Sequence, residues 1–515
     1  MTESVAAQPE ASSTDTVTGK RRALIAISVM LATVMQALDT TIANVALPHM
    51  QGSVGASQEQ ISWVLTSYIV AAAIFMPLVG FASDRLGRRR VFLWSVMGFT
   101  VASMLCGAAQ SLGQLVLFRL LQGVFGASLV PLSQAVMLDT FPKEKHGTAM
   151  AMWGMGVMLG PILGPTLGGW LTEYYSWHWV FYINLPLGIL AWLGISAFVE
   201  ETRLDHSRKF DMLGFVLLSL AIGALQMMLD RGQSQDWLQS SEVLLELVLA
   251  VAAFYLFVCH MFTSKAPYIE PGLFRDRNFN LGLIFIFVVG IILLATMALL
   301  PPFLQNLMGY PVMDVGLLLA PRGFGTMIAM MLVGRLSGRV DPRYMLLFGL
   351  LLTAFSMWEL TQFTTEVSRA AIIRTGLVQG FGLGFIFVPL TTISFSTLAP
   401  QYRNEATALY SLLRNIGSSI GISVVMTYLA QRTQINHAAF ANYITPYNQA
   451  LDNAVAQGAI DISGPAGLGL LNQMVTAQAS TLAFLQDFRL MMWVVLAAIP
   501  LLLLLRPSAP PGAAH

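Results

Sequence analysis

The sequence predicts an all-α integral membrane protein that crosses the bilayer with fourteen helices. Hydrophobic residues make up 56% of the 515 residues and charged residues only 11%, against about 25% charged residues in soluble domains. So few charges cannot cover a surface that faces water on all sides. Fourteen separate apolar runs are each long enough to cross a bilayer, which takes about 20 residues in an α-helix. The net charge of +1 gives no basic excess, so we expect no nucleic-acid partner.

The fourteen predicted spans follow one another along the whole chain. Three of them, 212–230, 343–361 and 404–430, contain several polar residues. In chain order the spans are 23–47, 60–82, 91–110, 114–138, 148–172, 178–199, 212–230, 242–263, 279–305, 313–335, 343–361, 370–393, 404–430 and 486–506.

The distribution of lysine and arginine sets the orientation. The first nineteen residues are polar, so we expect no cleavable signal peptide. Lys20-Arg21-Arg22 directly precedes the first span and places the N-terminus in the cytoplasm by the positive-inside rule. With fourteen spans, twenty Lys and Arg residues fall on the inside, four on the outside and four within spans. Removing one span would invert every later loop and destroy this bias, so both termini are expected to be cytoplasmic.

Two repeated patterns predict two related bundles. The turn at 80–90 after the second span is similar to 334–343 after the tenth, and 119–126 in the fourth span is similar to 374–382 in the twelfth. Because each pair lies eight spans apart, we expect two six-helix bundles separated by a two-helix insertion. Parallel repeats of this kind build transporters with a site between the halves. The expected parts are a cytoplasmic tail (1–22), a first bundle (23–199), the insertion with its loops (200–278) and a second bundle (279–515).

One external loop, 431–485, is much longer than the others. It is polar and alanine-rich, and a loop of this length is usually functional or disordered. Two interpretations remain open, a disordered spacer and a docking surface for an external partner.

Asp39 is the strongest candidate for proton coupling, because it lies well inside the first span. A lone charge there costs about 2.5–3.5 kcal/mol on insertion scales. Arg119 in the fourth span is its candidate partner, since the two residues lie about 12 and 7 Å from the outer ends of their helices at 1.5 Å per residue. Burial favours the protonated carboxyl and Arg119 favours the ionised one, so helix movement can switch proton binding. A static ion pair is the alternative. The switch requires that water reach the carboxyl from one side of the membrane.

Two further arginines, Arg322 and Arg414, lie within spans of the second half. Each can hold an anionic substrate, or can donate hydrogen bonds to helix carbonyls or extend towards an interface. No carboxylate partner is evident for either. The expected substrate cavity comprises Thr41, Asn44, Gln122, Arg322 and Arg414.

The fifth span carries a doubled Gly-Pro pattern. Glycines spaced by four form one smooth stripe that allows close contact with a neighbouring helix, and the prolines beside it remove two backbone hydrogen bonds and are expected to bend the helix. A helix-packing motif alone is the alternative. The residues are Gly160, Pro161, Gly164, Pro165, Gly168 and Gly169.

The cytoplasmic turn after the second span has two interpretations. Asp84 stands there among four arginines. These charges can serve as a plain cytoplasmic anchor, or as a latch that joins helix ends in one conformation and releases them in the other. The expected gating residues are Gly80, Asp84, Arg85, Gly87, Arg88 and Arg89.

Taken together, these segments resemble the major facilitator superfamily and, within it, the fourteen-helix drug/proton antiporters of the EmrB/QacA type, closest to the EmrB branch. The turn at 84–89 is similar to the superfamily's cytoplasmic signature, 119–123 to its proton-relay motif, and 160–169 to the motif of its antiporters. Segments 38–48, 177–186 and 229–237 are similar to this branch, where arginine is common at the position of His178. The second-half turn departs from the signature at Asp341 and Arg343.

The resemblance implies the major facilitator fold and proton-driven export of amphiphilic or hydrophobic toxic compounds across a bacterial inner membrane. It also implies a periplasmic membrane-fusion adaptor and an outer-membrane channel as partners, with the proton gradient as energy source and no cofactor.

Two other functions were weighed. A metabolite, fatty-acid or siderophore exporter on the same fold is the main alternative. A membrane-embedded enzyme would need clustered polar catalytic groups, whereas His49, Glu59 and Glu173 are scattered. We therefore assign no catalytic residue and no metal ligand. An ATP-driven pump is excluded because the sequence has no GxxxxGK[ST] phosphate loop.

Overall fold

The computed structural model describes residues 19–202, 204, 210–445, 448–449, 451 and 464–505. Thirteen helices in this part are long and apolar enough to cross a membrane, and the pair 60–75 and 78–86, bent by 56°, makes a fourteenth span. The described residues form no β-strand beyond one isolated bridge between Ser337 and Val340. The prediction of an all-α membrane protein with fourteen spans is confirmed.

Several predicted spans consist of two consecutive helical segments. The first bundle contains α1 (Gly19–Val54), α2 (Gln58–Phe75) with α3 (Leu78–Leu86), α4 (Arg88–Gly107), α5 (Leu112–Gly126) with α6 (Leu129–Thr140), α7 (His146–Tyr174), and α8 (Trp179–Tyr182) with α9 (Asn184–Phe198). The insertion is α10 (Met212–Arg231) and α11 (Ser241–Thr263). The second bundle contains α12 (Arg277–Pro302) with the π-helical turn η5 (Phe303–Leu307), α13 (Val312–Leu336), α14 (Pro342–Leu360), α15 (Arg369–Ser396), α16 (Arg403–Ala441), and α18 (Pro465–Ala498) with η7 (Ile499–Leu504).

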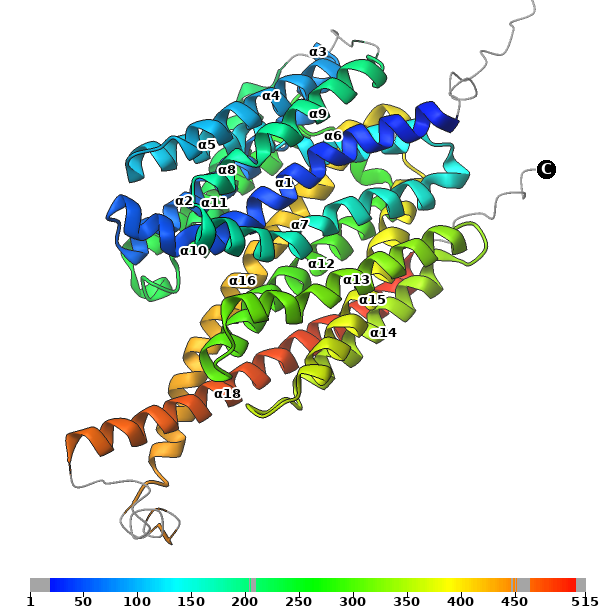
Figure 1. The fold of residues 1–515 in the computed structure, drawn as a ribbon. Helices are drawn as coiled ribbons and strands as arrows, with labels where there is room; N and C mark the ends of the chain where they lie inside the picture. The colour runs from blue at the N-terminus through cyan, green and yellow to red at the C-terminus, as the bar shows by residue number, and fades with distance from the viewer. Residues whose placement is uncertain are drawn as a thin grey trace, which may run out of the picture.

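The start of α1 and the end of η7 lie on the same side of the molecule (Figure 1). An even number of spans requires this arrangement. We call this side the inner side and the opposite side the outer side.

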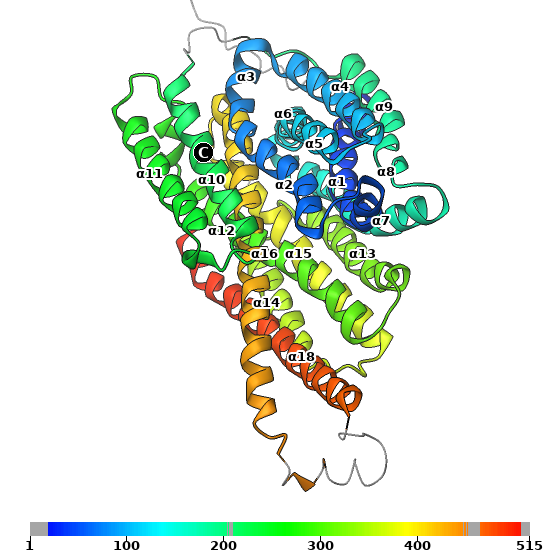
Figure 2. The same cartoon turned by 90° about the vertical axis from the view of Figure 1, so that its left-hand side faces the viewer.

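The two-helix insertion lies at the flank of the molecule (Figure 2), where α10 packs against both α2 and α16. Polar contacts join α10 to each bundle. The amide of Gln226 donates to Ser419 Oγ at 2.5 Å, and Ser423 Oγ donates to the carbonyl of Leu229 at 2.9 Å. On the other side, Thr66 of α2 donates to the carboxylate of Asp230.

The segment 431–485 is not the continuous loop that we expected. Helix α16 extends to Ala441 and α18 begins at Pro465, and the two helices project together away from the bundles on the outer side (Figure 1). We call the segments 431–441 and 465–485 the outer hairpin. Alanine and glutamine, which occur in both segments, and leucine, which is frequent in 465–485, favour helix. The amide of Asn436 also joins the two helices by donating to the carbonyl of Ala479 at 3.2 Å.

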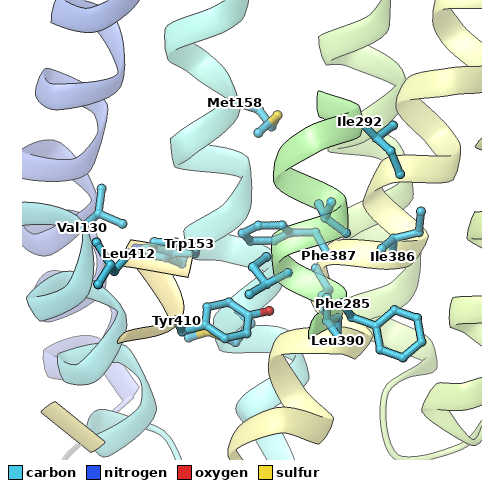
Figure 3. Packing of buried hydrophobic residues seen from close by; sticks show 14 of the residues in the cluster. Val130, Trp153, Met158, Phe285, Ile292, Ile386, Phe387, Leu390, Tyr410 and Leu412 are labelled. Atoms are coloured by element: carbon cyan, nitrogen blue, oxygen red, sulfur yellow. The ribbon is translucent and has the colours of Figure 1, made fainter. Parts of the chain in front are cut away.

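An apolar plug joins the two bundles in the inner half. Trp153 of α7 stacks on Phe387 of α15 with ring centroids 5.9 Å apart and planes inclined by 15°. Val130 of α6 and Leu412 of α16 lie beside this pair (Figure 3). Trp153 is fully buried and lies about 10 Å along α7 from its inner end, at 1.5 Å per residue. The plug therefore packs the two bundles against each other in the inner half of the molecule.

Candidate functional site

The centre of the first bundle holds a buried polar network around Asp39. Arg119 Nη1 of α5 lies 2.7 Å from Asp39 Oδ2, so the predicted ion pair is present. Asp39 Oδ1 accepts from Gln122 Nε2 at 2.7 Å and from Asn184 Nδ2 at 2.8 Å. The side chains of Asp39 and Arg119 are each 1% exposed. Three donors from α5 and α9 thus converge on one carboxylate of α1.

Further contacts surround this network, although Asn184 Oδ1 is buried without a hydrogen-bond partner. Arg119 Nε donates to the carbonyl of Val64 at 3.1 Å, and its guanidinium lies 4.4 Å from the ring centroid of Tyr68. Asn184 Nδ2 also donates to Ser103 Oγ at 2.9 Å. Charge-assisted hydrogen bonds of this number stabilise the ionised carboxylate. The network therefore supplies Asp39 with one cationic donor and two amide donors.

Two expectations about this region were wrong for this conformation. Asp39 was expected to be reachable by water, but the carboxylate is sealed from both sides. Gln122 was expected in the substrate cavity, but it is 0% exposed and bonded within the network. Proton exchange at Asp39 therefore requires α1, α5 or α9 to move. Asn184 was not among the predicted site residues, although it lies in the segment 177–186 on which the resemblance drew.

The glycine stripe of α7 packs directly on a neighbouring helix, and that helix is α1. A Cβ on Gly160 would lie 2.5 Å from the carbonyl carbon of Ala37, and one on Gly164 would overlap the hydroxyl of Thr41. Thr41 Oγ1 donates to the carbonyl of Gly160 at 3.0 Å. Gly168 lies against Ile42 and Val45 of α1, whereas Gly169 faces open space. The stripe thus places α7 on the helix that carries Asp39.

The proline side of α7 meets the second bundle. A Cβ on Gly316 of α13 would lie 3.6 Å from Pro165, and one on Gly323 would overlap the side chain of Ile162. The α-helix continues through both Pro161 and Pro165. Helix α7 therefore lies between α1 and α13, so a shift of the Asp39 helix can reach the second bundle through it.

A polar cluster joins the bundles at the inner side. Asp139 at the end of α6 forms ion pairs with Arg88, at 2.6 Å, and with Arg403 at the start of α16. The amide of Asn404 donates to Asp84 Oδ1 at 2.9 Å. Gly80 lies against the backbone of α16, because a Cβ there would be 3.0 Å from the Cα of Glu405. We call Asp84, Arg88, Asp139, Arg403 and Asn404 the inner latch.

The other gating residues do not cross between bundles in this structure. The backbone amide of Arg89 donates to the carboxylate of Glu201 at 3.0 Å, and Gly87 packs against the same side chain with φ at +94°. Arg85 is exposed. Gly80 and Asp84 contact α16 of the second bundle, whereas Arg88 pairs with Asp139 of its own bundle. The latch itself stays a prediction. Asp139, which was not among the expected gating residues, lies between Arg88 and Arg403 and pairs with both.

Arg322 and Arg414 have no counter-ion among the described residues. Arg322 is 9% exposed, and its Nη2 lies 3.4 Å from the carbonyl of Leu293, which is the hydrogen bond to a helix carbonyl that we had kept as an alternative. Arg414 is half-buried and forms no ion pair with the described residues. Asn44 is exposed.

The second bundle has no copy of the Asp39–Arg119 pair among its described residues. At the corresponding place Gln379 of α15 donates to Thr296 of α12 at 3.5 Å, and Arg374 pairs with Glu359 at 2.7 Å while 67% exposed. The second bundle does contain a different buried acid, Asp487 of α18, which is 0% exposed. In the described chain no group of three His, Cys, Asp or Glu residues has a metal-binding arrangement.

Comparison with known proteins gives consistent matches. The model of the Major Facilitator Superfamily matches residues 29–422. The chain is 36% identical to the fatty acid resistance protein FarB of Neisseria gonorrhoeae, over 95% of this chain and 97% of that protein. It is also 36% identical to the multidrug export protein EmrB of Escherichia coli, over 89% of this chain and 88% of that protein. A solved structure, the human organic anion transporter MFSD10, is similar in fold, with a TM-score of 0.60 at 15% identity over 92% of this chain and 99% of that one.

Proposed function

The chain belongs to the major facilitator superfamily, and on this premise we propose that it is a proton-driven multidrug exporter of a bacterial inner membrane. The observation that carries the proposal is the Asp39 network, because it places a titratable group on α1 next to α7, which contacts the other bundle. The energy source is the proton gradient, and both termini are cytoplasmic. Relatives named as multidrug exporters support the cargo class.

The proposed mechanism is alternating access with Asp39 as the proton-binding group. With the inner latch and the apolar plug closed, the cytoplasmic path is shut and Asp39 is ionised. A proton arriving from the outer side removes the charge that attracts the donors of α5 and α9. Helix α1 then loosens from them, and its close contact with α7 transmits the shift to α13. Once the inner side opens, drug entry and Arg119 favour loss of the proton to the cytoplasm.

A fatty-acid exporter is the second candidate, and a specific observation favours it. The relative from Neisseria gonorrhoeae is named a fatty acid resistance protein, and Arg322 and Arg414 are two cations without carboxylate partners in the described residues. Either guanidinium suits a carboxylate head group. Binding measurements with cationic dyes and with long-chain fatty acids, on the wild type and on Arg322→Gln and Arg414→Gln, separate the two cargo classes.

The proposed partners are a periplasmic membrane-fusion adaptor and an outer-membrane channel. The outer hairpin supports this part of the proposal, because it projects on the outer side and carries exposed apolar side chains. These include Ile435 at 55%, Leu468 at 55% and Met474 at 49% exposure. Large contiguous patches of exposed apolar residues mark sites of protein or membrane contact.

The test of the proposed function is dye efflux from proteoliposomes under an imposed pH gradient. The wild type is expected to move dye only when the gradient is present and to move protons in the opposite direction. Asp39→Asn is expected to bind dye but to lose efflux. Full drug/proton exchange by Asp39→Asn would overturn the assignment of Asp39, and efflux that ignores the gradient would overturn proton coupling itself.

A further inference from the structure

A carboxyl group that the mechanism above does not use lies inside the second bundle. Asp487 of α18 is 0% exposed, and neither of its oxygen atoms has a hydrogen-bond partner. The neighbouring Phe484 and Phe488 are also buried and pack against Phe303 of η5, with ring centroids 5.5 and 6.4 Å apart. The carboxyl is therefore enclosed largely by apolar groups.

No described charged group compensates Asp487. Helix α18 packs against α12, α14, α16, η5 and η7, and neither η5, η7 nor α12 beyond Arg277 contains a titratable residue. The other packed helices carry titratable groups, and several of these groups are held by partners other than Asp487. Glu359 of α14 pairs with Arg374, the guanidinium of Arg432 of α16 lies over Tyr428, and His437 of α16 contacts Asn472. On α18 itself, Arg489 is exposed. The remaining titratable residues are Arg343 and Tyr344 on α14, and Arg403, Glu405, Tyr410 and Arg414 on α16.

A buried carboxylate without donors or a counter-ion is highly unfavourable, and such a group takes up a proton instead. A bound metal cation does not replace the proton here, because such a cation needs several oxygen ligands. The described chain offers no acidic cluster that could supply them. The protonated carboxyl can donate to a carbonyl one turn back, at Ala483. The hydroxyl of Thr481, six residues earlier on this helix, donates in this way to the carbonyl of Ala477 at 2.8 Å.

The position of Asp487 connects it to two movable features. It lies two turns, or about 12 Å at 1.5 Å per residue, from Ala479, where the outer hairpin is joined by Asn436. It also lies beside η5, a π-helical turn that follows Pro301 and Pro302. Such turns interrupt the regular helix and are frequent at functional sites. A shift of α18 against η5 would open the carboxyl to water from the outer side.

We propose that Asp487 is a second proton-binding site, which holds a proton in this conformation and releases it when α18 shifts against α12 and η5. The two acids are then in opposite states, with Asp39 ionised in the first bundle and Asp487 protonated in the second. Each transport cycle moves one proton through each bundle. This inference rests on the proposed proton-coupled function, but the protonation of Asp487 can be measured without transport.

The first experiment is infrared spectroscopy of the purified full chain at neutral pH, which detects a protonated carboxyl directly. The wild type is expected to show this band, Asp487→Asn to lack it, and Asp39→Asn to retain it. Asp314→Asn is the matched control, because Asp314 is exposed and paired with Arg369 at 3.3 Å. A band that survives in Asp487→Asn overturns the proposal, whether or not the protein transports drugs.

The second experiment counts protons per exported dye molecule in proteoliposomes. Asp487→Asn is expected to lower the ratio by one proton while retaining efflux. An unchanged ratio would show that the proton at Asp487 is not transported and would overturn the proposal. If Asp487→Asn does not fold, Asp487→Leu replaces it, since an apolar side chain suits this site, and the same two measurements decide. A wild type without any proton coupling would instead refute the proposed function, which the infrared result distinguishes.

Discussion

Gly160 of α7 and Ala37 of α1 lie so close that a Cβ on the glycine would be 2.5 Å from the carbonyl carbon of Ala37. Backbone atoms cannot rotate away, so Gly160→Ala must push the two helices apart. We expect it to lower the free energy of unfolding by about 1–3 kcal/mol, as overpacking does, and to reduce efflux. Gly169→Ala on the same helix is the control, because no atom lies within 4 Å of a Cβ there. Thermal unfolding in detergent and dye efflux measure both effects, and equal damage by the two variants would contradict the contact.

The inner latch predicts a coupling between Asp139 and Arg403. Asp139→Asn and Arg403→Ala are each expected to weaken the closed inner side, and a double-mutant cycle is expected to give about 0.5–3 kcal/mol of interaction, as for other contacting residues. Spin labels at the inner ends of α3 and α16 report the distance between bundles, which is expected to increase in both variants. The exposed Arg85 serves as control through Arg85→Ala. Additive effects of the two latch variants would rule out the coupling.

The sequence was sufficient to predict the number of spans and the Asp39–Arg119 pair. Apolar runs of bilayer length and the lysine and arginine bias depend only on local composition, and the depth of each residue follows from helix rise. The glycine stripe was predictable for the same reason, since spacing by four fixes one helix face. The spacing does not indicate which helix the stripe contacts, and the structure shows that it is α1.

The spacing of residues along the chain does not reveal contacts between segments that lie far apart in the sequence. Arg403 lies 264 positions from Asp139, so nothing local indicated that this acid would cross between bundles. Gln122 was assigned to the substrate cavity, yet it bonds with Asp39 and Arg119. Asp487 was overlooked because the last span was expected to begin at 486. The helix actually starts at Pro465, which places Asp487 well inside it.

A substitution in the outer hairpin is expected to affect drug resistance of cells without affecting transport in vesicles. Leu468→Asp places a charge on an exposed apolar position of the hairpin. If the hairpin binds the adaptor, this variant retains dye efflux in proteoliposomes but loses drug resistance and co-purification of the adaptor. Leu238→Asp, at a position 61% exposed in the segment between α10 and α11, is the control and is expected to retain both. Full resistance of cells carrying Leu468→Asp would argue against docking at this position.

The Asp39–Arg119 pair can be tested as a proton switch against a static ion pair. Asp39→Asn alone leaves the buried charge of Arg119 without its partner, which typically costs about 3–5 kcal/mol of stability. The double variant Asp39→Asn with Arg119→Gln removes both charges, so it is expected to regain much of that stability in thermal unfolding. If the pair serves only as a static ion pair, the double variant would regain efflux as well. We expect proton-coupled efflux to stay absent, because the double variant has no group at this site that can exchange a proton. Restored efflux together with restored stability would assign the pair a purely structural role.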